Sequence, residues 1–215
     1  MKKRVGILIS GRGTNMVSLA KAARTPDYPA EIVLVVSNRP NTPGIERAKA
    51  LGLKTAVIDH KAFPSREAFD EAVEAALLGE RVELVCQAGF MRIQSAAFAT
   101  RWLGKQLNIH PSLLPLFKGL HPHQQALDAG VRISGCTVHF VTPELDAGPI
   151  IAQAAVPVLA GDTVAALEAR ILLAEHQLYP HALHLVASGA ATLNGDSVTL
   201  QTSINQGGPL LSPAP

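Results

Sequence analysis

Short apolar runs alternate with longer amphipathic stretches over the first half of the chain. Near-continuous apolar runs, several of them rich in β-branched side chains, are typical of strands that are buried on both faces. The runs expected to form strands are 5–9, 32–36, 55–58, 82–86 and 106–110. Stretches with helical character separate several of them, at 15–23, 44–50 and 65–78. This order predicts an α/β fold, a mostly parallel twisted sheet with helices on both faces.

The second half of the chain has a different pattern. Residues 136–141 alternate between two faces, which places Val138 on one face and His139 on the other. A second strand-like run, 149–158, follows after a short loop. We therefore expect antiparallel strands toward the C-terminal half, at the edge of the sheet.

A long helix and a hairpin are expected to complete the chain. Asp162 is a candidate N-cap for the helix, and Pro180 is expected to kink or interrupt it. Asn194-Gly195 lies between β-prone runs and resembles a hairpin turn. We expect a single catalytic domain over residues 1–200 and a flexible tail over residues 201–215.

Composition and charge narrow the class of protein. Of the 215 residues, 47% are hydrophobic, which excludes a disordered chain, yet the apolar runs are too short to cross a bilayer. The formal net charge of +2 comes from scattered basic residues, so we expect no nucleic-acid partner. Cys86 and Cys136 lack CxxC spacing, and the basic start Met1–Arg4 does not lead into a signal sequence. A cytoplasmic protein with no membrane partner is predicted.

A glycine-rich segment between the first strand and the first helix is a candidate anion site. Gly11 and Gly13 let backbone N–H groups approach an anion, the helix N-terminus adds partial positive charge, and Thr14 and Asn15 add donors. A tight turn without a ligand is the alternative. A dinucleotide site is less favoured, because Met16 stands where that motif has a third glycine.

Asn108 and His110 are the candidate reacting groups. Residues i and i+2 of a strand share a face, and ligands of such sheets collect at the carboxyl ends of strands, where this pair falls. An amide can polarise a carbonyl oxygen and an imidazole can move a proton, which suits acyl transfer. A structural histidine is the alternative.

A turn-rich loop and several histidines offer further groups. The loop 142–149 carries Asp146, which could orient the ring of His110, although a solvated turn would have the same sequence. His121 and His123 could bind a metal, but their spacing matches no metal motif, and we expect no metal.

Three stretches together resemble the folate-dependent formyltransferases: residues 108–115, 119–121 and 144–150. Residues 10–15 and 89–93 are most similar to the members of that family that act in purine synthesis. The resemblance implies a Rossmann-like formyltransferase fold. It also implies transfer of the formyl group of 10-formyltetrahydrofolate, as co-substrate, to the amine of glycinamide ribonucleotide.

The resemblance also implies roles for individual residues. On this template Asn108 holds the formyl oxygen, His110 donates and carries the proton, and Asp146 keeps the imidazole charged and oriented. The residues implied for glycinamide ribonucleotide are Gly11, Arg12, Gly13, Thr14, Asn15 and Glu175. Those implied for folate are Arg66, Met91, Arg92, Ile93, Gln94, Asn108, Val141 and Asp146, and His121 is a possible accessory residue.

The chain departs from the family pattern beside the expected folate site. Gln94 and Gln106 stand where apolar residues are expected, which predicts an altered wall around the pterin ring. Arg12 is also less usual in its loop than a small or amide residue, although its charge suits an anion.

Related activities remain as alternatives. Formyltetrahydrofolate deformylase is a hydrolase with a similar Asn, His and Asp set, and a non-catalytic nucleotide-binding module would need only the glycine-rich loop. The hydrolase and the tRNA-directed formyltransferase usually carry an additional domain, so the length of the chain favours small-molecule formyl transfer.

Overall fold

The computed structural model describes residues 1–201 and residue 212. Its main sheet has seven strands in the order β3-β2-β1-β4-β5-β6-β7. The strands are β1 (Lys3–Ile9), β2 (Ala30–Ser37), β3 (Thr55–Val57), β4 (Leu84–Gln87), β5 (Gln106–His110), β6 (Ile133–Phe140) and β7 (Ile150–Pro157). The pairs from β3 to β5 are parallel, and β6 is antiparallel to both β5 and β7. The predicted α/β class and the antiparallel edge are confirmed.

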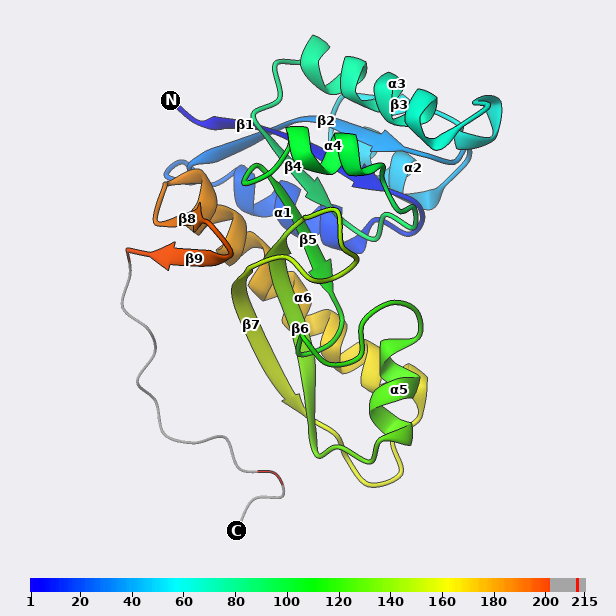
Figure 1. Ribbon diagram of the computed structural model, residues 1–215, viewed down its shortest axis with the longest axis vertical. Coiled ribbons are helices and arrows are strands. Elements are labelled where there is room, and N and C mark those ends of the chain that lie inside the picture. The colour runs from blue at the N-terminus through cyan, green and yellow to red at the C-terminus, as the bar shows by residue number, and fades with distance from the viewer. Residues whose placement is uncertain (202–211, 213–215) are drawn as a thin grey trace.

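Helices cover both faces of this sheet (Figure 1). They are α1 (Thr14–Ala23), α2 (Pro43–Ala50), α3 (Arg66–Gly79), α4 (Ala96–Arg101), α5 (Pro122–Asp128) and α6 (Val164–Ala187), with one 3-10 turn, η1 (His60–Ala62). The α4 and α5 helices were not expected, because six or seven residues are too few to establish a helical period.

Alternate residues of each strand enter two separate hydrophobic clusters. Ile7 and Ile9 of β1 pack with α1 and α6, whereas Leu8 packs with α3 and α4 on the other face. The second cluster draws its strand residues from β1, β2 and β4. Farther along the same face, β5 presents polar residues, Asn108 and His110 among them. The site therefore lies where the cover of α3 and α4 ends.

The expected N-cap of α6 is wrong, and so is the expected interruption at Pro180. Thr163, not Asp162, caps the helix, since its Oγ1 accepts a hydrogen bond from the Ala166 N–H at 3.2 Å. Asp162 instead accepts two hydrogen bonds from the Arg170 guanidinium. Pro180 does not interrupt the helix, which runs unbroken on both sides of it because tertiary packing holds the adjacent turns.

The predicted hairpin is confirmed, with its turn shifted by one residue. Strands β8 (Ala191–Asn194) and β9 (Ser197–Leu200) pair antiparallel, and Asn194 faces Ser197, so Gly195 and Asp196 form the loop. Gly195 has φ +57°, a conformation that glycine adopts without strain. The predicted tail, 201–215, lies outside the described residues except for residues 201 and 212.

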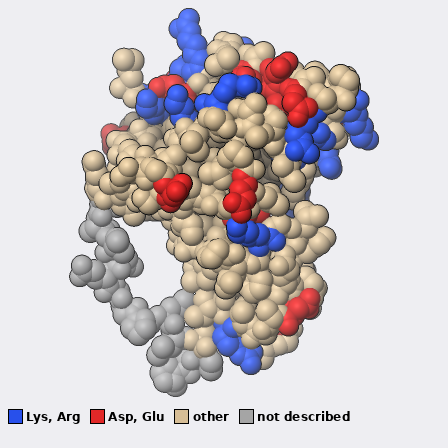
Figure 2. All heavy atoms as spheres, viewed as in Figure 1, with Lys and Arg blue, Asp and Glu red and all other residues tan. Residues whose placement is uncertain are grey.

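The described residues contain no helix long and apolar enough to cross a membrane. On the face shown in Figure 2, Lys and Arg side chains lie among Asp and Glu side chains around the upper part of the molecule, and the middle is mostly uncharged.

Candidate active site

A cavity of about 790 Å³ opens at the carboxyl ends of β1, β4 and β5. It is lined by every residue that the sequence predicted for the site except Arg66. Arg66 is the exposed first residue of α3 and does not line the cavity, so its folate contact stays a prediction. The cavity also takes in Gln87, His123, His139 and Glu168, which were not predicted as site residues.

The glycine-rich loop enters this cavity from β1 and leads into α1. Gly13 is the N-cap of α1, with φ +70°. A Cβ there would lie 2.8 Å from the Gly44 Cα, so a side chain is excluded twice, by backbone conformation and by contact. Around Gly11, by contrast, a Cβ would meet no atom within 4 Å, which leaves open space at the helix N-terminus. This arrangement can accept an anionic group.

Two acidic residues of α6 face this loop. The Asn15 amide donates a hydrogen bond from Nδ2 to Glu175 Oε2 at 2.7 Å, and both side chains are buried. Burial raises the pKa of Glu175 to about 7, although the Asn15 hydrogen bond opposes the shift. At the exposed rim, Arg12 forms a 2.6 Å ion pair with Glu168. The predicted substrate residues are thus linked to α6 by two polar contacts.

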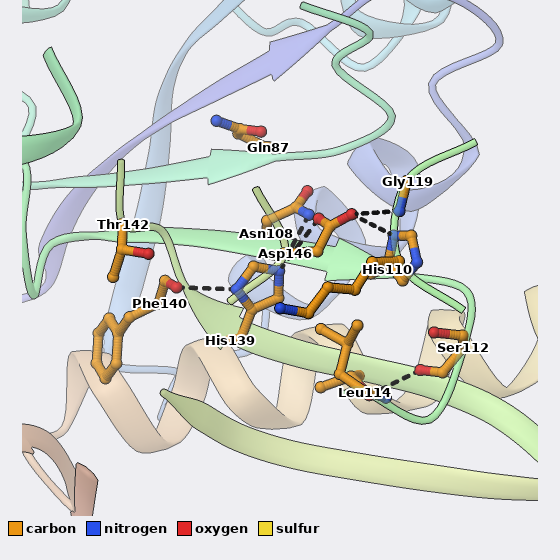
Figure 3. Close-up of polar contacts among 12 residues, drawn as sticks. Gln87, Asn108, His110, Ser112, Leu114, Gly119, His139, Phe140, Thr142 and Asp146 are labelled. Carbon is orange, nitrogen blue, oxygen red and sulfur yellow. Dashed lines mark hydrogen bonds and ion pairs between the residues drawn. The ribbon is translucent and has the colours of Figure 1, made fainter. Parts of the chain in front are cut away.

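Asn108 is oriented by a neighbour on β6. The antiparallel register places Asn108 opposite His139, and Asn108 Nδ2 lies 3.2 Å from His139 Nε2 (Figure 3). The other ring nitrogen, Nδ1, is 2.8 Å from the Phe140 carbonyl oxygen, so it carries the proton and donates. Burial lowers the pKa of His139, which favours the neutral ring with Nε2 as an acceptor. The Asn108 amide therefore presents its N–H groups in a defined direction.

His110 is held between two acceptors. Its Nε2 lies 2.9 Å from the Phe117 carbonyl oxygen, and its Nδ1 lies 3.4 Å from Asp146 Oδ2. A ring whose two nitrogens both face acceptors is suited to the imidazolium form, in which both are donors. The same Asp146 oxygen accepts a hydrogen bond from the Gly119 N–H at 2.9 Å, which holds the carboxylate in place (Figure 3).

Three non-glycine residues with strained backbone conformations lie at Asp146 and in the segments near His110. Phe117, His121 and Asp146 all have φ values between +47° and +57°, in the left-handed region that non-glycine residues seldom occupy. Such residues persist where the surrounding structure holds them, and they are frequent at functional sites. His121 precedes α5 and lines the cavity with an exposed side chain.

The loop after β4 forms another wall of the cavity. The Met91 N–H donates to Ser10 Oγ at 2.8 Å, which ties this loop to the end of β1. The Arg92 guanidinium lies 5.4 Å from the centre of the Phe69 ring, in cation–π contact. Met91 and Ile93 are exposed apolar side chains at the cavity, with 66% and 54% of their surface accessible.

His139 contacts Asn108 in the cavity but was not predicted from the sequence as a site residue. The alternation along residues 136–141 placed its side chain on one face, but the contact with Asn108 depends on the β5–β6 register.

Within the described part of the chain, no group of three or more His, Cys, Asp or Glu side chains is arranged to hold a metal ion.

An α/β sheet that places an amide, an imidazole and a carboxylate beside a glycine-rich loop in one cavity suits a group-transfer enzyme. The chain belongs to the formyl transferase family, whose model matches residues 3–183. It is 42% identical to the phosphoribosylglycinamide formyltransferase of Escherichia coli, over 90% of this chain and 92% of that protein.

Two further relatives extend this comparison. The solved structure of glycinamide ribonucleotide transformylase 1 from Symbiobacterium toebii is 47% identical, has a TM-score of 0.90, and is matched over 93% of this chain and 94% of that one. The trifunctional purine biosynthetic protein adenosine-3 of Bos taurus is 53% identical over 89% of this chain. This chain spans only 19% of the length of that bovine protein.

Proposed function

We propose that this chain transfers the formyl group of 10-formyltetrahydrofolate to the amine of glycinamide ribonucleotide. The products are formylglycinamide ribonucleotide and tetrahydrofolate, in de novo purine synthesis. The observation that carries the proposal is the convergence of Asn108, His110 and Asp146 on one cavity that also contains the glycine-rich loop. The relatives matched over nearly their whole length bear the name of this activity.

In this proposal, the reaction begins when the substrate amine attacks the formyl carbon and a tetrahedral intermediate forms. Asn108 Nδ2 donates to the oxygen that becomes negative, with its orientation set by His139. His110 supplies a proton to the departing folate nitrogen and receives one from the attacking amine. Asp146 stabilises the imidazolium and keeps the ring in place.

The glycine-rich loop holds the substrate phosphate in this proposal. Gly11, Gly13 and Thr14 lie at the N-terminus of α1, where N–H groups without helical partners favour an anion. Arg12 adds a positive charge, and Glu175 contacts the glycinamide or ribose portion. The folate lies against residues 91–94 and 141–146, which line the remaining walls.

A single assay distinguishes the transferase from the hydrolase. The protein is incubated with 10-formyltetrahydrofolate, and tetrahydrofolate release is followed with and without glycinamide ribonucleotide. Release that requires the nucleotide supports the proposal. Equal release without the nucleotide identifies a deformylase, and nucleotide binding without release in either condition identifies a non-catalytic module.

We also propose that the enzyme works in the cytoplasm on small molecules. Cys86 and Cys136 are both free thiols and both buried, which is usual in a reducing compartment. The formal net charge of only +2, together with the mixed charges on the face shown in Figure 2, supports small-molecule substrates in preference to a nucleic acid.

A further inference from the structure

Three glutamine side chains meet in the wall of the cavity. We call Gln87, Gln94 and Gln106 the amide cluster. Gln94 Oε1 accepts two hydrogen bonds, one from Gln87 Nε2 at 2.7 Å and one from Gln106 Nε2 at 2.5 Å. The three residues come from the end of β4, the loop that follows it and the start of β5. Three separate segments thus bring amide groups to one point.

The amide cluster adjoins the reacting centre. Gln106 lies two residues before Asn108 on β5, so both side chains project to the same face of the sheet. Gln87 pairs with Asn108 in the parallel register between β4 and β5, and the close-up shows it beside Asn108 (Figure 3). Gln87 and Gln94 line the cavity, and Gln106 is fully buried behind them.

Two polar groups of the amide cluster have no partner in the described part of the chain. They are the donor Gln94 Nε2 and the acceptor Gln106 Oε1, and both are buried. A buried amide group without a hydrogen bond is unfavourable, so a protein keeps one where something else pairs with it. Gln94 is only half-buried and sits on a loop, so rotation of its side chain can bring its N–H groups to the cavity.

We propose that the amide cluster recognises the heterocyclic ring of the folate co-substrate through hydrogen bonds, and so selects for ring nitrogens and carbonyl groups. This inference rests on the proposed function. The folate ring carries carbonyl and ring-nitrogen acceptors, which complement the free donor Gln94 Nε2, while Gln106 lies behind Gln94 and donates to its oxygen. An apolar wall at the same place would bind a carbon ring equally well.

The test compares two co-substrates that differ only in the ring. One is 10-formyltetrahydrofolate, and the other is its analogue with a naphthalene ring in place of the pterin, which has no ring nitrogen and no ring carbonyl group. The Kd of each is measured by equilibrium binding, together with its KM at saturating glycinamide ribonucleotide. The proteins are the wild type, Gln94→Leu, Gln94→Leu/Gln106→Leu, and the control Gln124→Leu on the exposed side of α5.

We expect the double variant to lose roughly tenfold of the wild-type preference for the tetrahydrofolate, since one or two hydrogen bonds to the ring are lost. Gln124→Leu keeps the wild-type preference. A Kd ratio that is unchanged in folded variants overturns the inference. If the double variant does not fold, Gln94→Leu alone decides, because its loop position tolerates an apolar side chain.

The binding ratio also separates this inference from the proposed function. Absence of formyl transfer in the wild type contradicts the proposed function, while the two Kd values still report on the ring. Normal transfer with equal Kd values for the two rings contradicts the amide cluster alone.

Discussion

At the scale of single residues, the site depends on which atom of each side chain is free. His139 takes one N–H of Asn108, and the second N–H is available to a carbonyl oxygen in the cavity. His110 has both nitrogens engaged, with Phe117 and with Asp146. Asn108 therefore has a free N–H group, and His110 lies two residues farther along on the same face of β5.

Replacing Asn108 by alanine is expected to lower kcat by roughly 100- to 1,000-fold, since loss of one oxyanion donor has that effect in acyl transfer. Initial rates of tetrahydrofolate release measure the change, and Asn194→Ala in the β8–β9 hairpin is the control. Unfolding by urea should remain cooperative. A variant with wild-type kcat would remove Asn108 from the mechanism.

The raised pKa of Glu175 predicts how the free energy of unfolding depends on pH. Its pKa is about 7 in the folded chain and 4.5 for an ordinary glutamate, so between these pH values the native state binds more protons than the unfolded state. Stability contributed by this group is therefore lost as the pH rises from about 4.5 through 7, by roughly 3 kcal/mol in total.

The variant Glu175→Gln should abolish this loss, because the amide has no proton to release and can still accept from Asn15. Free energies of unfolding in urea at pH 5 and pH 8 measure it, as the difference from the wild type. Asp196→Asn, in the exposed β8–β9 loop, is the control. Parallel pH profiles for Glu175→Gln and the wild type would refute the assignment.

At the scale of elements, the antiparallel strand β6 and the loop after it supply the side chains that surround Asn108 and His110. It runs beside β5 and carries Thr137 and His139 opposite His110 and Asn108. The loop that leaves β6 then returns Asp146 over the same residues. Strand pairing thus assembles the site from residues that are about 30 to 40 positions apart in the sequence.

His139→Leu is expected to lower kcat by about tenfold with little change in KM, because the Asn108 amide loses the acceptor that orients it. His139→Gln retains an acceptor and should recover part of the rate. Steady-state kinetics measure both, with His181→Gln on the exposed side of α6 as the control. Equal rates for the Leu and Gln variants would show that orientation of Asn108 is not the cause.

Substitutions at Thr163 test its role as the N-cap of α6. Thr163→Ala removes the acceptor for the Ala166 N–H and should lower the free energy of unfolding by about 1 kcal/mol. Thr163→Ser retains the hydroxyl and should be close to the wild type. Urea unfolding curves compare the two, and equal losses would contradict a capping role.

At the scale of the whole molecule, the strands were predictable because helices cover both faces and leave continuous apolar runs. The Asn108 and His110 pair was predictable because strand periodicity is local. Other features could not be predicted from the sequence, because each depends on which strands and loops are neighbours in space. They are the contacts of His139, the amide cluster and the exposed position of Arg66.

In the proposed function, one cavity holds both a formyl donor and a nucleotide acceptor. The most direct measurement is single-turnover transfer of labelled formyl from 10-formyltetrahydrofolate, with mass detection of the products. We expect the label to appear on glycinamide ribonucleotide and tetrahydrofolate release to require this nucleotide. Label recovered as free formate, at the same rate with and without the nucleotide, would contradict it.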